Sequence, residues 1–181
     1  MAERFYYERP SAVRKADIIE YLNEFEAAGS EINGSGSLDR ILSGWTFEQA
    51  LERCLSMEDK EYARKVGRCP GKTFLLIREN DSRIVGTVNV RWDLNEEMLR
   101  FGGHIGYSVR PSWRRRGVGT AMLKDMLRLC KENYRLDRIL VTCNEDNIGS
   151  KKVIINNGGI LENKILYPPE NRYIERYWIA L

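Results

Sequence analysis

The segment from Val109 to Ala121 constrains the fold more than any other part of this sequence, because an apolar strand leads through a glycine-bearing turn directly into a long amphipathic helix. Helix N-termini carry main-chain N–H groups without intrahelical partners, together with the positive end of the helix dipole. Gly117 and Gly119 leave that backbone open to a ligand. The turn is therefore predicted to bind an anion such as a phosphate.

Four arginines surround the same turn, namely Arg110, Arg114, Arg115 and Arg116. One phosphate charge about 4 Å from one guanidinium is worth roughly 4 kcal/mol at an effective dielectric near 20, compared with about 0.3–1 kcal/mol from the helix dipole. We expect the arginines to supply affinity and the backbone to supply the shape of the site.

The glycine pattern excludes two common nucleotide motifs. The sequence contains no G-x-x-x-x-G-K-[ST] loop, and Met122 stands where a dinucleotide fingerprint has its third glycine. The spacing Arg114-x-x-Gly117-x-Gly119, after a strand ending in Val109 and before Asn147 and Ser150, resembles the GNAT superfamily of acyl-CoA-dependent N-acetyltransferases. This resemblance covers roughly residues 72–181.

The resemblance implies an α/β fold: a mixed, mostly antiparallel sheet with a V-shaped splay between two central parallel strands, and helices on both faces. It implies acetyl-CoA as co-substrate and no metal. Tyr107 to Val109 would pair through the backbone with pantetheine, and Asn147 would hydrogen-bond the same arm beside Ser150. The coenzyme pyrophosphate would lie on the turn formed by Arg114, Arg115, Arg116, Gly117, Val118, Gly119 and Thr120.

A chain of 181 residues suits one domain. We expect residues 1–70 to form a helical front part and residues 71–181 to form the core with the coenzyme site. The front helices either line the substrate or simply pack on the sheet. Expected helices are Ala12–Ala28, Thr46–Val66, Gly117–Asn133 and Asn147–Asn157, and expected strands are Phe5–Glu8, Thr73–Arg78, Ile84–Trp92, Gly103–Arg110, Ile139–Asn144, Ile160–Tyr167 and Tyr173–Leu181, with a flexible loop at Gly29–Ser37.

Composition narrows the class of protein further. The net charge of +3 does not by itself indicate a nucleic acid or a membrane as partner. Four cysteines without C-x-x-C spacing, with a single histidine, argue against zinc and redox motifs. The sequence shows no secretory leader and no apolar run long enough to span a bilayer, so we expect a cytoplasmic protein. A homodimer through the terminal hairpin is possible.

Acetyl transfer needs a neutral amine, and a lysine-like amine with a pKa near 10.4 costs roughly 4.6 kcal/mol to deprotonate at pH 7. A general base contributes about 10²–10⁴-fold, whereas positioning gives effective molarities of roughly 10⁵–10⁸ M. His104 is the candidate general base, because its ordinary pKa is near neutrality. Because side chains alternate along a strand, His104 points to the opposite face of the strand from Val109 unless a bulge intervenes. The alternative is therefore a core or substrate-pocket histidine.

Other residues have weaker claims. Glu96 and Glu97 either attract a cationic amine or are solvated turn residues, and Asn147 is either a pantetheine ligand or a plain N-cap. Cys143 is either an acyl-carrying nucleophile or a small core residue. Many members of the family have a tyrosine acid where Ile154 stands here, which leaves the general acid unassigned.

The sequence thus predicts an N-acetyltransferase that moves an acetyl group from acetyl-CoA directly to a primary amine of a small molecule or peptide in a ternary complex. A second hypothesis is an acyl-CoA-binding sensor or pseudoenzyme without turnover. A third is an RNA-binding module that uses the arginines with Trp113. No residue pattern identifies the acceptor.

Overall fold

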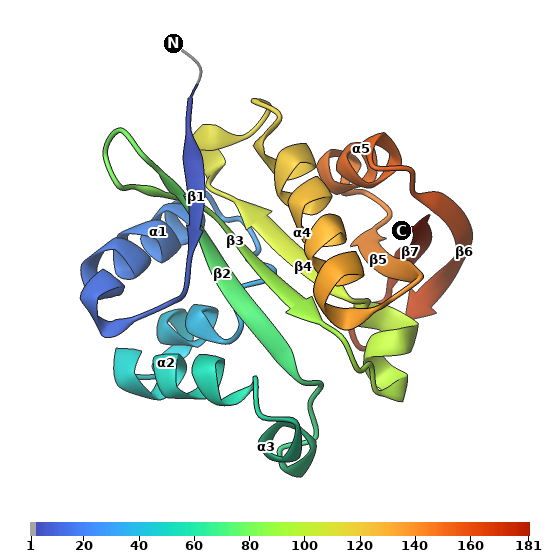
Figure 1. Ribbon diagram of the computed structural model, residues 1–181, viewed down its shortest axis with the longest axis horizontal. Helices are drawn as coiled ribbons and strands as arrows, with labels where there is room; N and C mark the ends of the chain where they lie inside the picture. Colours follow the sequence, from blue (N-terminus) through green and yellow to red (C-terminus); the bar gives the residue numbers. More distant parts are fainter. Residues whose placement is uncertain (1–2) are drawn as a thin grey trace.

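Two antiparallel sheets form the centre of the computed structural model, which describes residues 3–181 (Figure 1). The first sheet has the order β1-β2-β3-β4, and the second has the order β5-β7-β6. The strands are β1 Phe5–Glu8, β2 Gly71–Arg78, β3 Ile84–Arg91, β4 Ile105–Val109, β5 Arg138–Asn144, β6 Ile160–Tyr167 and β7 Arg172–Ala180.

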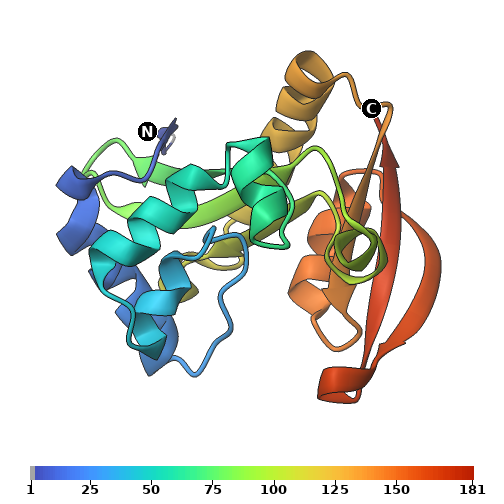
Figure 2. The same cartoon turned by 90° about the horizontal axis from the view of Figure 1, so that it is seen from below.

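The two sheets meet at β4 and β5 and then diverge. Within residues 3–181, these strands share no ladder of hydrogen bonds, and only an isolated bridge between Gly103 and Val141 connects the sheets at this point. The bridge itself is antiparallel. Gly103, which forms it, has a left-handed φ of 71°. In Figure 2, the strands of the second sheet lie to the right of the first sheet and run in a different direction. The V-shaped splay predicted from the sequence is therefore present.

Helix α4, Val118–Tyr134, explains why β4 and β5 run in the same direction. The helix starts beside the end of β4 and returns the chain to the opposite end of the sheet, where β5 begins (Figure 1). Its apolar side, including Met122, Leu123 and Met126, is buried against the sheet, as the helical spacing predicted. With α5, Ile148–Asn156, it covers one side of the molecule.

The other face of the first sheet is covered by α1, Lys15–Ala27, which buries Ile18, Leu22 and Phe25 against β2 and β3. Helix α2, Phe47–Ser56, packs beside it and begins at the predicted capping box of Thr46 and Gln49. These front helices therefore pack on the sheet, which was one of the two expectations for them.

Four segments differ from the predicted elements. The single helix expected over 46–66 is two helices, because Asp59 accepts hydrogen bonds from the N–H groups of Glu61 and Tyr62 and starts α3, Lys60–Lys65. Helical turns at η1 Ala12–Arg14, η2 Leu38–Ser43 and η3 Met98–Gly102 were not predicted as separate elements. Short 3₁₀ and π turns have too few residues to show a clear periodicity.

The loop at 29–37, expected to be flexible, lies against β4. The N–H of Asn33 donates to Oγ of Ser108 at 2.6 Å, and Ser35 is buried. A Cβ added to Gly34 would lie 2.1 Å from the carbonyl oxygen of Gly106. Two glycines facing one another thus allow this loop to approach the middle of β4.

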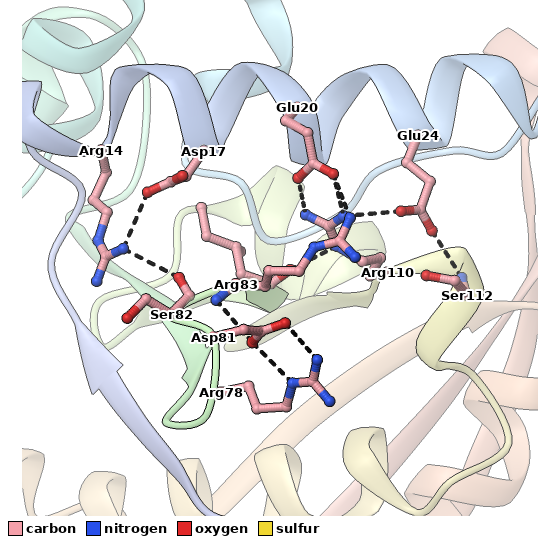
Figure 3. A network of polar contacts seen from close by, with 11 residues as sticks. Arg14, Asp17, Glu20, Glu24, Arg78, Asp81, Ser82, Arg83, Arg110 and Ser112 are labelled. Atoms are coloured by element: carbon pink, nitrogen blue, oxygen red, sulfur yellow. Dashed lines mark hydrogen bonds and ion pairs between the residues drawn. The ribbon is translucent and has the colours of Figure 1, made fainter.

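Arg110 connects α1 to the end of β4 and is the largest fully buried side chain (Figure 3). Its guanidinium donates to Glu20 at 2.6 and 2.9 Å and to Glu24 at 2.9 Å, while Nε donates to the carbonyl oxygen of Ile84. Glu24 also accepts the N–H of Ser112 at 2.8 Å. The expectation that Arg110 adds charge at the phosphate turn is therefore wrong, because two carboxylates of α1 neutralise the guanidinium.

We expect the double variant Glu20→Gln, Glu24→Gln to lose about 3–5 kcal/mol of unfolding free energy, because it leaves the buried Arg110 guanidinium without a counter-charge. Urea denaturation measures this change. Glu26→Gln, at an exposed position on α1, is the matched control. Equal midpoints for the double variant and the control would contradict this role of the pairs.

Candidate functional site

The turn between β4 and α4 presents a row of main-chain N–H groups. Within the part of the chain that the structure describes, no hydrogen bond occupies the N–H groups of residues 115–120. Arg115 and Gly117 both have left-handed φ values, 60° and 78°, and Gly117 is the N-cap of α4 without a side-chain cap. Successive N–H groups in such a turn form a concave anion site. The geometry of the predicted phosphate turn is therefore suited to an anion.

The two glycines of the turn have different tasks. A Cβ on Gly117 would meet no atom within 4 Å, so its glycine is needed for the positive φ. A Cβ on Gly119 would lie 3.2 Å from Cγ2 of Val153 on α5 and 3.5 Å from Cγ2 of Val109 on β4. Gly119 thus brings the start of α4 close to both elements.

The three arginines of the turn do not act alike. Arg114 lies over the Phe25 ring, donates to Oγ of Ser30 at 2.7 Å and contacts the carbonyl oxygen of Val109, so its side chain is turned toward α1. Arg116 lies 4.6 Å over the Trp113 ring and lines a shallow hollow of about 240 Å³ beside Gly117 and Val118. Arg115 is exposed. Arg115 and Arg116 therefore remain to attract an anion to the turn.

The edge of β4 that faces the V has free backbone groups. The carbonyl oxygen of His104 accepts the N–H of Arg91, and the N–H of Arg110 donates to Val85, so the even-numbered residues bond to β3. In an antiparallel pair, the intervening residues then direct both backbone groups to the other edge. These intervening residues are Ile105, Tyr107 and Val109, although the carbonyl oxygen of Val109 accepts Nε of Arg114.

Tyr107 and Asn147 approach the V from its two sides. The Tyr107 hydroxyl and Oγ of Ser150 are 2.9 Å apart, and burial raises the pKa of the phenol. Oδ1 of Asn147 accepts the N–H of Ser150 at 3.0 Å, so Asn147 is the N-cap of α5. Among the described residues, its amide nitrogen makes no hydrogen bond, which leaves a donor beside the V. Capping the helix and binding a ligand are therefore compatible.

His104 lies at the closed end of the V. Its main-chain N–H donates to the carbonyl oxygen of Leu140 at 2.8 Å, and Nδ1 of its imidazole accepts the main-chain N–H of Leu140 at 3.0 Å. The register between β3 and β4 is unbroken, so no bulge moves His104 to the face of Val109. Burial, with the charge of Arg91, lowers the pKa of the imidazole to about 4. His104 is thus neutral at pH 7, and the lone pair of Nδ1 is occupied.

The remaining candidates have mainly structural surroundings. Burial raises the pKa of the Cys143 thiol to about 11, with the charge of Glu175 acting in the same direction. Ile154, where a tyrosine was expected, is fully buried in the core. Glu96 and Glu97 lie in the turn before η3, and both side chains are exposed. The surroundings of Cys143 and Ile154 are those of core residues, and Cys143 packs in the same cluster as Tyr107.

Sequence reasoning missed a polar column on the face of the first sheet opposite α4. Thr73 on β2 lies opposite Asn89 on β3, and the amide of Asn89 donates to the Thr73 hydroxyl at 3.0 Å. Arg91 and His104 continue this face. The available signal was the polar residues at alternate positions of apolar strands.

Comparison with known proteins identifies the family. Residues 33–160 match the family model described as an acetyltransferase (GNAT) domain. The chain belongs to the GNAT acetyltransferase family. This family of acyltransferases was the one predicted from the turn and its neighbouring strands. Among the described residues, no helix has the length and apolar character needed to cross a membrane.

A curated GNAT relative, the L-amino acid N-acetyltransferase AaaT of Escherichia coli, is 31% identical over 105 residues, which cover 55% of this chain. The match spans only 62% of the length of that relative. Solved structures share the fold along nearly the whole chain. RimL, a ribosomal α-N-protein acetyltransferase in complex with coenzyme A, has a TM-score of 0.68 at 15% identity, covering 98% of this chain and 94% of its own. The self-immunity acetyltransferase MccE, in complex with acetyl-CoA and AMP, has a TM-score of 0.69 at 11% identity, with 98% and 92% covered.

We expect the stability of the protein to fall as the pH decreases from 6.5 to 5, because the unfolded chain protonates its single histidine in this range while folded His104 stays neutral. The decrease is at most about 1.4 kcal/mol per pH unit. His104→Gln keeps a side-chain acceptor for Leu140 and removes this dependence. Urea denaturation at several pH values measures both slopes, and identical slopes would refute the assignment.

Proposed function

We propose that this protein is an N-acetyltransferase that transfers the acetyl group of acetyl-CoA directly to a primary amine in a ternary complex. The observation that carries the proposal is the continuity of two sets of free backbone groups. The unbonded N–H groups of residues 115–120 lie directly after the V-facing edge of β4. Such a path suits a ligand that combines a pyrophosphate with an amide-containing arm.

In the proposed complex, the pyrophosphate lies on the turn from Arg114 to Thr120, and the pantetheine arm follows Tyr107 and Val109 into the V. The free amide of Asn147, with Ser150 beside it, faces that arm from α5. Arg115 and Arg116 supply charge to the phosphates. The bound coenzyme of RimL and of MccE supports this choice of ligand, because both share the fold.

The transfer needs no covalent enzyme intermediate. The neutral amine nitrogen attacks the thioester carbonyl carbon, the C–S bond breaks, and the amine loses its proton to solvent or to a base. The departing thiol, with a pKa of about 8.5, leaves acceptably without a named acid. Direct transfer is favoured because burial keeps the Cys143 thiol protonated. A base role for His104 stays a prediction, and it requires release of the Leu140 N–H from Nδ1.

The acceptor enters from the face of the sheet opposite α4, where an ion pair crosses between the two halves of the molecule. Arg172 of β7 donates to Glu31 of the loop after α1 at 2.9 Å. The names of AaaT and RimL supply two kinds of amine acceptor, free amino acids and a ribosomal protein N-terminus. Both are within the class of small-molecule or peptide amines proposed for this chain.

We also propose that residues 1–70 and 71–181 form one domain, because Arg110 at the end of β4 forms ion pairs with two glutamates of α1. The described cysteines are free thiols, which supports the prediction of a cytoplasmic protein. A homodimer stays a prediction. An RNA-binding role has little support, since Arg110 pairs with Glu20 in the interior and the side chain of Arg114 donates to Ser30.

Acetyl-CoA binding is tested by isothermal titration of Gly117→Val. The valine places a branched side chain at the mouth of the anion turn, so the affinity should fall at least about tenfold, equivalent to one lost hydrogen bond of about 1.4 kcal/mol. Gly67→Val is the control, because Gly67 has a similar φ of 69° and open surroundings but lies after α3. Unchanged affinity in Gly117→Val would remove the turn from the site.

Turnover is tested by the release of free coenzyme A thiol in the presence of an amine panel. Sustained release above buffer hydrolysis is expected, and its absence with every amine would favour the sensor hypothesis, which Ile154 motivates. Cys143→Ala should keep most of the rate, and intact-mass analysis should find no acetylated protein on the reaction path. Loss of activity in Cys143→Ala with acetyl-CoA affinity retained would overturn direct transfer.

A further inference from the structure

Arg91, the last residue of β3, is a half-buried cation in an unusual position. Its main-chain N–H donates to the carbonyl oxygen of His104, the residue before β4. Its Nη1 donates to the carbonyl oxygen of Gly103 at 2.8 Å. Its Nη2 lies 3.2 Å from the point that a Cβ of Gly106 would occupy. The guanidinium therefore extends along the face of the sheet opposite α4, from the start of β4 to its middle.

This guanidinium has no carboxylate partner among residues 3–181. The buried guanidiniums of Arg110 and Arg176, in contrast, pair with Glu20 and Glu162. Burial lowers the pKa of Arg91, and the charge of Arg68 acts in the same direction. A desolvated cation without a counter-charge is costly unless an anion joins it. The unmatched charge thus indicates a bound anion.

A second main-chain donor lies beside the same space. The N–H of Gly34, in the loop after α1, lies 3.3 Å from the point that a Cβ of Gly106 would occupy, and it makes no hydrogen bond in the described chain. Residue 106 is glycine, so no side chain lies between this N–H and Nη2 of Arg91, and a Cβ there would already be in close contact with both, at 3.3 and 3.2 Å. A guanidinium and a neighbouring N–H are a suitable pair of donors for the two oxygens of a carboxylate.

The same residue, Gly106, also borders the V. Its chain neighbours Ile105 and Tyr107 direct their backbone groups to the V-facing edge, where the proposed thioester would lie. A carboxylate held over Gly106 would lie one residue along β4 from the backbone groups of Ile105 and Tyr107 that point to this edge. That spacing suits an acceptor whose amine and carboxylate are attached to the same carbon.

We propose that Arg91 and the Gly34 N–H bind the carboxylate of the acceptor, so that the substrate is a free α-amino acid. This inference rests on the proposed function and selects between its acceptor classes. At a protein N-terminus, the α-carbon carries an amide in place of a carboxylate, which leaves Arg91 without its counter-charge. A site built around such a polar group discriminates strongly against ligands that lack the partner.

The experiment compares free L-amino acids with their own carboxamides, using thiol release to obtain kcat/KM. The wild type should prefer the acid over the amide by at least about 100-fold. Arg91→Gln should reduce this preference to within about tenfold by lowering the value for the acid alone, with the main effect on KM of the acceptor. Arg68→Gln, which removes a nearby charge in the same field, is the control and should keep most of the preference.

A merely structural role for Arg91 predicts a different result, in which acid and amide lose activity in parallel. Unchanged acetyl-CoA affinity shows that each variant is folded, and Arg91→Lys, which keeps the charge without the planar fork, should recover part of the preference. Equal use of acids and amides by the wild type would overturn this inference and leave acetyl transfer to amines intact.

Binding of the product provides a readout that does not depend on turnover. In the presence of coenzyme A, an N-acetyl-L-amino acid should bind more tightly than its carboxamide, and Arg91→Gln should abolish the difference. Selective binding without any thiol release would support the carboxylate site while refuting the proposed function. Equal binding of the acid and the amide by the wild type would refute the carboxylate site.

Discussion

The separation of β4 from β5 is the constraint on which the rest of this structure depends. Neighbouring strands in a sheet normally satisfy each other's backbone groups, but within residues 3–181 β4 and β5 share no ladder, and their strand pairing is limited to an isolated bridge at Gly103 and Val141. The odd-numbered residues of β4 therefore direct their N–H and C=O groups into a gap. Unsatisfied backbone groups are costly when buried, so a gap of this kind suits a ligand that supplies the missing partners.

The V is held open by contacts at its closed end and along its sides. His104 forms two hydrogen bonds with Leu140 at the closed end, which fixes where the strands meet. On one side, Gly119 allows α4 to pack tightly against α5 and β4. On the other side, Arg110 attaches α1 to the end of β4 through Glu20 and Glu24, as Figure 3 shows. The coenzyme turn thus begins from a strand that is anchored on both faces.

The arginines show how tertiary contacts divide residues that look equivalent in the sequence. Arg110, Arg114, Arg115 and Arg116 are close neighbours, yet Arg110 is neutralised in the interior and Arg114 is turned toward Ser30. Arg91, which is remote from this cluster in the chain, has no counter-charge among residues 3–181 and faces the proposed acceptor space. Local charge density therefore indicated the predicted phosphate turn, whereas the proposed acceptor site follows only from the pairing of charges across the fold.

The sequence by itself determined the order of elements and the position of the glycine turn before the central helix, because strand alternation, helical periodicity and the spacing from Arg114 to Gly119 are local properties. It also placed the capping box at Thr46 and the N-cap at Asn147. Only the tertiary structure decided that the loop at 29–37 covers β4, that the lone pair of His104 is occupied, and that Arg91 lacks a counter-charge. Each of these depends on contacts between segments distant in the chain, for which a single sequence carries no periodic signal.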